Sequence, residues 1–427
     1  PQARALRHLF FAERRAAKSV GLREKRPLAS VAVLGGGWIG AGLAAELLRH
    51  GLCVTLVEVA RDPLAAALSR VARMQEADLA RGRLSLEKQQ ADWDRLQPAT
   101  ALAACATADL VIEAIDEDLG HKTALLRALS GVRAGQGPVL SVTCGLDTGA
   151  LATAYGRAGA HGSLFVADPV RRTDLAELAA TGQPGDLATD AAQTLARLLG
   201  WRLIRQQPGR AFLAPRLLTA LFDAADRFLA AGCDPAEVDR ALRGYGYATG
   251  AFALRDVYGP DHALLRHALR RKGVLPAPLS AAVAGFMHKE GRRGRRSKAG
   301  YYLYPDAGGP GRADPHLLAF LDGLRGRAAV AAAKLHLDLT AALANEGAWA
   351  LSQDQARCPS DIDLIAVAQG FPRWRGGPMQ AADEAGLLTL RSLLRDWANG
   401  GDPFWEPAPL WDDLIRNGRK FADLNPQ

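Results

Sequence analysis

The chain has 427 residues with a formal net charge of +8, and 48% of them are hydrophobic and 23% charged. This length predicts two or three domains with ample buried core, and the composition is ordinary for a soluble globular protein. No apolar run approaches 18 residues and no signal peptide is recognisable, so we expect neither a membrane span nor export. The five cysteines are odd in number, widely spaced and without metal-ligand spacing, which predicts a reducing cytoplasmic location and no metal site.

The positive charge is densest in "GRRGRRSK", residues 291–298, which is followed by the aromatic "YYLY". No nucleic-acid-binding module is recognisable, and the other basic residues are scattered. The run is therefore interpreted as a solvated basic loop, with attraction for a phosphate-bearing small molecule as the alternative. We expect no nucleic-acid partner.

The chain is predicted to open with a helix. Residues 3–18, "ARALRHLFFAERRAAK", place on one helical face Leu6, Leu9, Phe10 and Ala17. The following "REKRP" is typical of a linker. The chain begins with Pro1 rather than Met, so we expect a fragment or processed piece.

Strand-like and helical segments alternate from Ser30 onwards. The apolar strand-like runs are residues 30–34, 53–57, 110–114, 138–142, 164–167 and 201–204. This alternation predicts a parallel sheet covered by helices on both faces.

Long helices rich in Ala, Leu and Arg follow residue 207, and they contain an internal repeat. "DPAEVDRALRGYG" (234–246) aligns with "CPSDIDLIAVAQG" (358–370), and beyond a three-residue insertion Gly250, Asp256 and Gly259 recur as Gly377, Asp383 and Gly386. Two related helical bundles are expected, joined near Pro305 to Pro315. The predicted fold is an α/β Rossmann-type domain followed by two related all-α domains, with boundaries at 1–28, 29–207, 208–305 and 316–427.

The segment "VAVLGGGWIGAGLAAELLRHGLCVTLVEV" carries a dinucleotide fingerprint, because Gly35, Gly37 and Gly40 have the G-x-G-x-x-G spacing between a strand and a helix. Gly35 would permit the tight turn, Gly37 the approach of the pyrophosphate, and Gly40 close helix–strand packing. Glu58, at the end of the next strand, would accept hydrogen bonds from the adenosine ribose. Its carboxylate favours NAD over NADP, although Arg61 is near.

The chain resembles the 3-hydroxyacyl-CoA dehydrogenase half of the multifunctional β-oxidation enzymes. The resemblance runs nearly end to end, through "GGGWIGAG", "ADLVIEAIDEDLGHK", "GRRGRRSKAGYYLY", "DIDLIAVAQGFPRWRGGP" and "GDPFWEPAPLWDDL". It implies NAD and an acyl-CoA as ligands, and an enoyl-CoA hydratase half upstream of the linker helix. It also implies that Glu117 and Lys122 lie near the nicotinamide end of the cofactor. A capped helix start with a solvated charge pair is the alternative interpretation of "EDLGHK". The oligomeric state stays open.

Residues 161–183, "HGSLFVADPVRRTDLAELAATGQ", are predicted to form a short strand from Leu164 to Ala167, closed by Asp168-Pro169, then a basic turn and Glu177. In the family, a histidine opens the strand motif His-Phe-Phe-Asn-Pro, with a glutamate twelve residues later. Phe165 stands at the histidine position here, and Glu177 at the glutamate position. We expect Glu177 to be solvated or paired with Arg171 or Arg172.

Two further catalytic positions of the family are altered. Cys144 replaces a serine that would contact the substrate oxygen, and Pro215 replaces an asparagine that opens the first helix of the next domain. His161 is interpreted as a surface-loop residue, because four residues along a strand displace it by roughly 13 Å from the position of Phe165.

Two functions fit these observations. The chain is either a 3-hydroxyacyl-CoA dehydrogenase module with impaired or rearranged chemistry, using Asp168 or a water as base, or a degenerate module that binds NAD or acyl-CoA or supports a hydratase domain. A lost general base typically costs about 10²–10⁴ in rate. Three losses at four polar positions favour the degenerate module.

Overall fold

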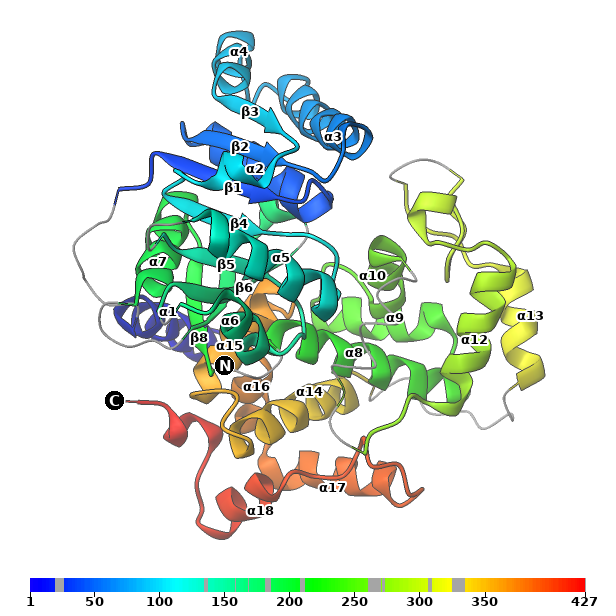
Figure 1. Ribbon diagram of the computed structural model, residues 1–427. Coiled ribbons are helices and arrows are strands. Elements are labelled where there is room, and N and C mark those ends of the chain that lie inside the picture. The colour runs from blue at the N-terminus through cyan, green and yellow to red at the C-terminus, as the bar shows by residue number, and fades with distance from the viewer. Residues whose placement is uncertain are drawn as a thin grey trace. The chain divides into compact units, whose positions relative to one another are not determined.

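The computed structural model describes residues 1–19, 27–133, 137–157, 159–167, 169–180, 186–207, 212–259, 270, 273–305, 309–324 and 335–426. Two compact units divide the chain. One is Glu13–Phe212, and the other combines Pro1–Ala12 with Leu213–Gln427 (Figure 1). Within the described ranges, no helix is long and apolar enough to cross a membrane.

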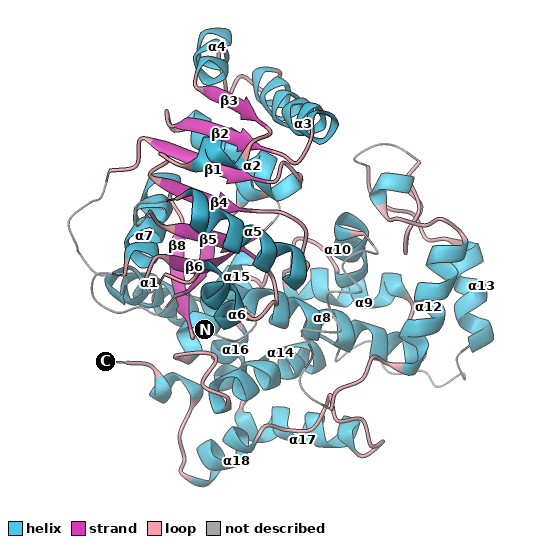
Figure 2. Ribbon diagram, in the orientation of Figure 1, coloured by secondary structure: helices cyan, strands magenta, loops and turns pink. Residues whose placement is uncertain are grey.

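The unit Glu13–Phe212 is built on an eight-stranded sheet in the order β3-β2-β1-β4-β5-β6-β7-β8 (Figure 2). The strands are β1 (Ser30–Leu34), β2 (Cys53–Val57), β3 (Leu96–Ala99), β4 (Leu110–Glu113), β5 (Val139–Val142), β6 (His161–Val166), β7 (Leu175–Ala179) and β8 (Arg202–Gln206). Its helices are α2 (Trp38–Arg49), α3 (Arg61–Leu79), α4 (Leu86–Asp94), α5 (Leu119–Val132), α6 (Thr148–Tyr155) and α7 (Leu187–Leu199), with short 3-10 turns η1 (Leu102–Cys105) and η2 (Val170–Arg172). All neighbouring strands pair in parallel except β6 and β7.

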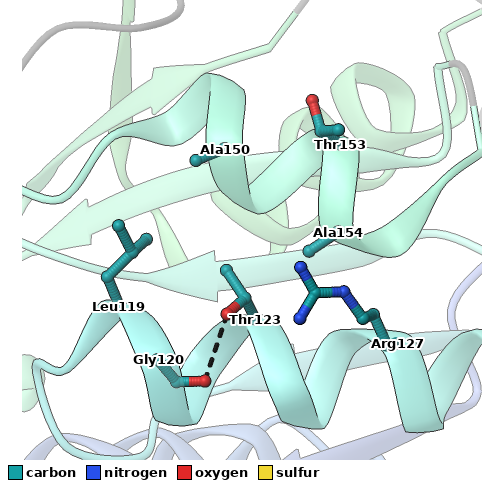
Figure 3. A pocket seen from close by; sticks show the side chains of 7 residues that line it. All are labelled: Leu119, Gly120, Thr123, Arg127, Ala150, Thr153 and Ala154. Carbon is teal, nitrogen blue, oxygen red and sulfur yellow. Dashed lines mark hydrogen bonds between the residues drawn. The ribbon is translucent and has the colours of Figure 1, made fainter.

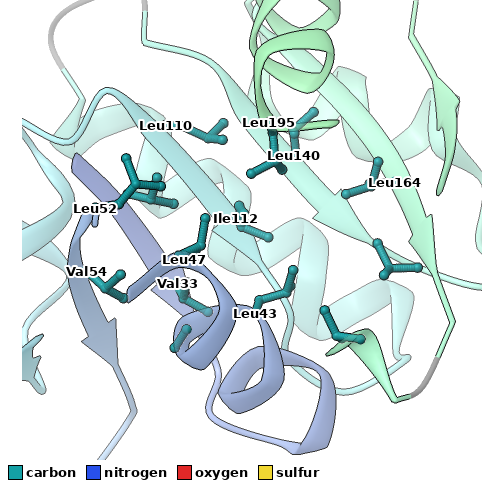
Figure 4. Packing of buried hydrophobic residues seen from close by; sticks show 14 of the residues in the cluster. Val33, Leu43, Leu47, Leu52, Val54, Leu110, Ile112, Leu140, Leu164 and Leu195 are labelled. Carbon is teal, nitrogen blue, oxygen red and sulfur yellow. The ribbon is translucent and has the colours of Figure 1, made fainter. Parts of the chain in front are cut away.

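The central strands are apolar on both sides because helices cover both faces of the sheet. Val31 and Val33 of β1 join a buried cluster with α2 and α7, shown in Figure 4. Ala32 and Leu34, the alternate residues, join a second cluster with α5 and α6. Strands buried on both faces are continuous apolar runs, which is why the sequence pattern found them.

Two strands were not predicted from the sequence. β3 contains Pro98, which is tolerated because β3 is an edge strand. β7, "LAELA", runs antiparallel to β6 and contains Glu177 instead of an unbroken apolar run. β6 also begins at His161, three residues before the predicted start.

The other unit is helical. Its helices are α1 (Gln2–Ser19, shared with the first unit), α8 (Leu213–Ala230), α9 (Pro235–Tyr245), α10 (Ala251–Tyr258), α12 (Pro278–Lys289), α13 (Pro315–Leu324), α14 (Leu335–Ser352), α15 (Pro359–Ala368), α16 (Pro378–Ala385), α17 (Leu387–Ala398) and α18 (Pro409–Arg416), with 3-10 turns η3 (Arg295–Ser297), η5 (Arg373–Arg375) and η6 (Phe421–Leu424). The predicted Rossmann-type sheet followed by a helical region is confirmed.

The repeat detected in the sequence has a matching structure in two places. Asp239 on α9 accepts hydrogen bonds from two backbone N–H groups at the start of α10, and Asp363 on α15 does the same at the start of α16. A Cβ at Gly250 would lie 2.1 Å from Asp239, and one at Gly377 would lie 2.3 Å from Asp363. The glycine therefore allows the aspartate to reach the helix in both copies.

The third partner of this aspartate differs between the two copies. The Tyr302 hydroxyl donates to Asp239 at 2.9 Å, whereas the His8 ring lies 2.8 Å from Asp363 through Nε2. His8 belongs to α1, so the N-terminal helix completes the second copy.

The expected apolar face of α1 is wrong. Of its predicted members only Leu9 is buried, together with the small residues Ala5, Ala12 and Ala16, while Leu6 is 46% and Phe10 52% exposed. Small side chains allow this helix to pack closely, and the larger apolar side chains lie on its outer side.

Candidate active site

The fingerprint glycines form a tight turn between β1 and α2. Gly35 has φ of +92°, and a Cβ there would lie 2.8 Å from the carbonyl oxygen of Ala114. A Cβ at Gly40 would lie 1.9 Å from the Gly35 carbonyl oxygen, so both positions exclude a side chain. Gly37 precedes α2, and a Cβ there would meet no atom within 4 Å, which leaves open space at the helix N-terminus. This cradle fits a dinucleotide pyrophosphate.

Glu58 lies beside the same turn at the carboxyl end of β2. Its Oε1 accepts a hydrogen bond of 2.6 Å from the backbone N–H of Gly36, and its Oε2 accepts one of 3.2 Å from Val59. The carboxylate is thus placed against the glycine turn, where the fingerprint pattern expects the adenosine ribose.

Glu117 joins two loops at the carboxyl ends of β4 and β5. Its Oε1 accepts hydrogen bonds from the Thr143 hydroxyl at 2.6 Å, from Cys144 N–H at 2.7 Å and from Gly145 N–H at 3.0 Å. Three donors on one oxygen hold the loop after β5 in place. The predicted contact of Glu117 with the cofactor stays a prediction.

Lys122 is fully buried, so the interpretation of a solvated charge pair is wrong for this residue. Its Nζ donates to Glu113 Oε1 at 2.6 Å and to the Val142 carbonyl at 2.9 Å. Burial raises the pKa of Glu113, and the charge of Lys122 opposes that rise. The predicted helix cap is present, because Asp118 accepts from the backbone N–H of His121.

Phe165 and Glu177 lie directly opposite each other on β6 and β7. The Phe165 ring packs in a tilted arrangement against Phe212, with the centroids 6.1 Å apart. Glu177 is fully buried, and its Oε2 accepts a hydrogen bond of 2.6 Å from Nε2 of Gln206. The carboxylate is therefore held inside the sheet by a neutral amide.

The expected solvation of Glu177 is wrong, because the residue is fully buried. Arg171 forms ion pairs with Asp78 and Glu46 instead of Glu177, whereas the expected pairing with Arg172 stays a prediction. Gln206 was missed because the predicted strand ended at residue 204, and nothing near Gln206 in the sequence indicates that its amide reaches Glu177.

Cys144 follows β5 and brings no ionised group. Burial, followed by the nearby carboxylates of Glu117 and Glu177, raises the pKa of the Cys144 thiol, so it stays protonated at neutral pH. Pro215 is the third residue of α8 in the helical unit, where its carbonyl accepts from the Thr219 hydroxyl. Asp168, the alternative base, lies outside the described residues.

His161 is the first residue of β6 and is buried, so its interpretation as a surface-loop residue is wrong. Its Nε2 lies 3.0 Å from the Ser141 hydroxyl oxygen. Burial lowers the pKa of His161 to about 4, which keeps the ring neutral. It stands at the opposite end of β6 from Phe165.

The basic run 291–298 is only partly solvated. Arg292 is buried, donates to the Gly300 carbonyl and pairs with Asp314, and Arg295 stacks over the Tyr304 ring at 4.6 Å. These two arginines stabilise the loop itself, so the prediction of a solvated loop is wrong for Arg292.

A pocket lies between α5 and α6 (Figure 3). It is lined by Leu119, Gly120, Thr123, Arg127, Ala150, Thr153 and Ala154. The two threonine hydroxyls donate to backbone carbonyls of their own helices, at Gly120 and Gly149. The pocket therefore offers mainly apolar atoms, and it contains none of the predicted site residues.

Two family models match the chain. The NAD-binding domain of 3-hydroxyacyl-CoA dehydrogenase matches residues 30–207, and the C-terminal domain of 3-hydroxyacyl-CoA dehydrogenase matches residues 212–304. The two matches together span more than half of the chain.

Known proteins similar to the chain include multifunctional enzymes. A peroxisomal bifunctional enzyme from Danio rerio is 30% identical over 98% of this chain and 61% of its own length. A fatty acid oxidation complex subunit alpha from Shewanella amazonensis is 26% identical over 99% of this chain and 60% of its own length. The chain thus spans about three fifths of the relatives it matches.

Solved structures share the fold. A 3-hydroxybutyryl-CoA dehydrogenase from Escherichia coli K12 superposes with a TM-score of 0.74 at 20% identity, covering 92% of this chain and 99% of that chain. The dehydrogenase part of a multifunctional enzyme from C. elegans gives a TM-score of 0.64 at 18% identity, covering 91% and 90%.

Proposed function

Because the chain belongs to the 3-hydroxyacyl-CoA dehydrogenase family, we propose that it is an NAD-binding dehydrogenase module of fatty acid β-oxidation whose own turnover is impaired. Its substrate class is a 3-hydroxyacyl-CoA, which the reaction would oxidise to the 3-oxoacyl-CoA. The glycine cradle and Glu58 support the binding half of this proposal. The proposed loss of turnover is supported by the arrangement of Phe165, Glu177 and Gln206.

The reaction needs a base that the described residues do not supply at this position. NAD would accept the hydride at its nicotinamide, and a protein group must take the hydroxyl proton. Phe165 has no proton acceptor, Glu177 is engaged by Gln206, and His161 is buried at the far end of β6. We therefore expect a rate about 10²–10⁴ below that of an intact dehydrogenase.

A binding or scaffolding role is the second candidate, and the hydrogen bond from Gln206 to Glu177 favours it. The buried carboxylate accepts a hydrogen bond from this amide, and the contact links β7 to β8, which is a structural role. In this case the module would bind NAD or an acyl-CoA and support an upstream enoyl-CoA hydratase domain. Both roles use the same cofactor cradle.

Calorimetric titrations with NAD and with NADH, followed by a measurement of NADH production from a 3-hydroxyacyl-CoA, test the proposal. We expect a dissociation constant in the micromolar range that is common for such sites, with little or no NADH produced. Turnover at tens per second would contradict the impairment. Absence of binding to both NAD and NADH would contradict the cofactor assignment.

The organisation and surroundings of the module are also proposals. Its helical part consists of two domains, residues 208–305 and 316–427, and the equivalent contacts of Asp239 and Asp363 support this division. Residues 1–28 would link the module to an upstream domain. The five free cysteines support a reducing compartment, for which we propose the cytoplasm.

A further inference from the structure

The peptide group of Gly36, inside the fingerprint turn, is held from two sides. Its N–H donates to Oε1 of Glu58 at 2.6 Å, and its carbonyl oxygen accepts from Nη1 of Arg70 at 2.9 Å. Glu58 follows β2, whereas Arg70 lies on the third turn of α3. Two elements that are distant in the sequence therefore set the orientation of this peptide.

A glycine at position 36 is what lets α3 approach. A Cβ at Gly36 would lie 2.1 Å from the Cβ of Ala67, far inside van der Waals contact. Arg70 follows Ala67 by three residues and so lies on the same face of α3. Close packing at Ala67 thus brings the Arg70 guanidinium to the turn.

Arg70 brings a positive charge to a turn that has none of its own. The sequence "GGGWIGAG" contains no charged residue. Arg70 is half-buried, and its guanidinium carbon lies 5.9 Å from the ring centroid of Trp38, the first residue of α2. A guanidinium has five N–H donors, and the Gly36 carbonyl uses one of them.

We propose that Arg70 binds the pyrophosphate of the dinucleotide and determines part of its affinity. The proposal rests on the NAD binding proposed above. The space beside Gly37 lies at the N-terminus of α2, whose dipole supplies only about half a positive charge against a pyrophosphate with two negative charges. Arg70 supplies the missing charge, while the Gly36 carbonyl and the Trp38 ring hold its planar fork in place.

Arg70→Gln tests this role, with Arg73→Gln as the matched control. Arg73 lies on the same helix, is exposed, and has no described contact with the turn. NADH, NADPH, ADP, 2′,5′-ADP and adenosine are titrated calorimetrically into the wild type and both variants. We expect Arg70→Gln to weaken NADH and ADP binding about tenfold and to leave adenosine binding unchanged, because adenosine carries no phosphate.

Salt dependence separates a phosphate contact from a purely structural role. Phosphate contacts weaken as salt rises, so the dissociation constant of ADP should depend less steeply on KCl in Arg70→Gln than in the wild type. Arg70→Lys retains the charge but loses the fork, and it should recover part of the affinity. If thermal unfolding shows that Arg70→Gln is not folded, Arg70→Lys is used as the test variant instead.

Three results would overturn the role of Arg70. These are equal NADH binding by Arg70→Gln and Arg73→Gln, an equal loss for adenosine and ADP, or a loss confined to NADPH and 2′,5′-ADP, which would place the guanidinium at a ribose phosphate. A wild-type chain that binds neither NADH nor ADP would overturn the proposed cofactor binding as well.

Discussion

Gln206 donates a hydrogen bond of 2.6 Å from its side-chain amide to Oε2 of Glu177. The two residues belong to the neighbouring parallel strands β8 and β7, and both are buried. Phe165 lies opposite Glu177 on the other side, on β6. The carboxylate that would orient a catalytic imidazole in the family is therefore held by an amide in this chain.

Phe165→His alone should restore little activity, because Gln206 already engages Glu177. The double variant Phe165→His/Gln206→Val removes the amide that competes with the new imidazole for this carboxylate, and we expect its rate to exceed that of the single variant about tenfold or more. Single-turnover formation of NADH from a 3-hydroxyacyl-CoA measures both rates.

Stability provides the control for this pair. Gln206→Val alone leaves a buried carboxylate short of a donor and should cost about 1–3 kcal/mol in the free energy of unfolding. The loss should shrink in the Phe165→His background, where the imidazole supplies a donor. Equal rates for the single and double variants would show that Gln206 does not compete with the imidazole for Glu177.

The parts of the site that were predictable from sequence depend on local geometry. The spacing of Gly35, Gly37 and Gly40 identified the turn. Backbone atoms leave no room for a side chain at Gly35 and Gly40, whereas Gly37 lies beside open space at the start of α2. Strands with continuous apolar residues were also predicted, because an apolar run is a local pattern that can be recognised from the sequence. Asp239 and Asp363 were recognised as repeated positions, although their shared contact with the next helix was not foreseen.

The parts that were missed depend on pairing between distant segments. β7 was missed because Glu177 interrupts its apolar pattern, and the amide of Gln206 that bonds to this buried glutamate belongs to another strand. Arg70 was missed because nothing near it in sequence shows that α3 packs against Gly36. The interpretation of His161 as a loop residue failed because its buried partner, the Ser141 hydroxyl, lies on another strand. Nothing near His161 in the sequence indicates this contact.

Lys122→Met should strongly destabilise the sheet unit. It would leave the buried carboxylate of Glu113 without its cation, which typically costs about 3–5 kcal/mol. Lys122→Met/Glu113→Gln removes both charges and should cost less. Chemical denaturation measures both values, and His121→Ala is the control, because its exposed pair with Asp116 contributes little. If the double variant is as unstable as the single one, the charge of Glu113 is not the cause.

The two helical repeats should respond alike when the third partner of their aspartate is removed. His8→Ala takes a ring nitrogen from Asp363 and Tyr302→Phe takes a hydroxyl from Asp239, so each should cost about 1–2 kcal/mol. His288→Ala, exposed on α12, should change stability by less than about 0.5 kcal/mol. Denaturant midpoints of the three variants test this. A loss for Tyr302→Phe without one for His8→Ala would show that α1 is not needed to complete the second repeat.

His161 should make the sheet unit less stable as the pH falls below 6.5. Burial lowers the pKa of its imidazole from 6.5 to about 4, so between these values the unfolded chain binds a proton that the folded chain does not. The stability that depends on the neutral ring is fully present above pH 6.5 and is lost as the pH falls towards 4.

His161→Gln isolates this contribution from that of the carboxylates. Glutamine does not titrate and can still bond to the Ser141 hydroxyl, so the variant should keep the acid sensitivity of the carboxylates alone. The free energies of unfolding of the two proteins are compared at pH 7 and pH 4.5. We expect the wild type to lose about 2–3 kcal/mol more than the variant over this range, since one unit of pKa shift corresponds to about 1.4 kcal/mol. Parallel pH profiles for wild type and variant would show that His161 is protonated in the folded chain or hydrated, and that its burial does not limit acid stability.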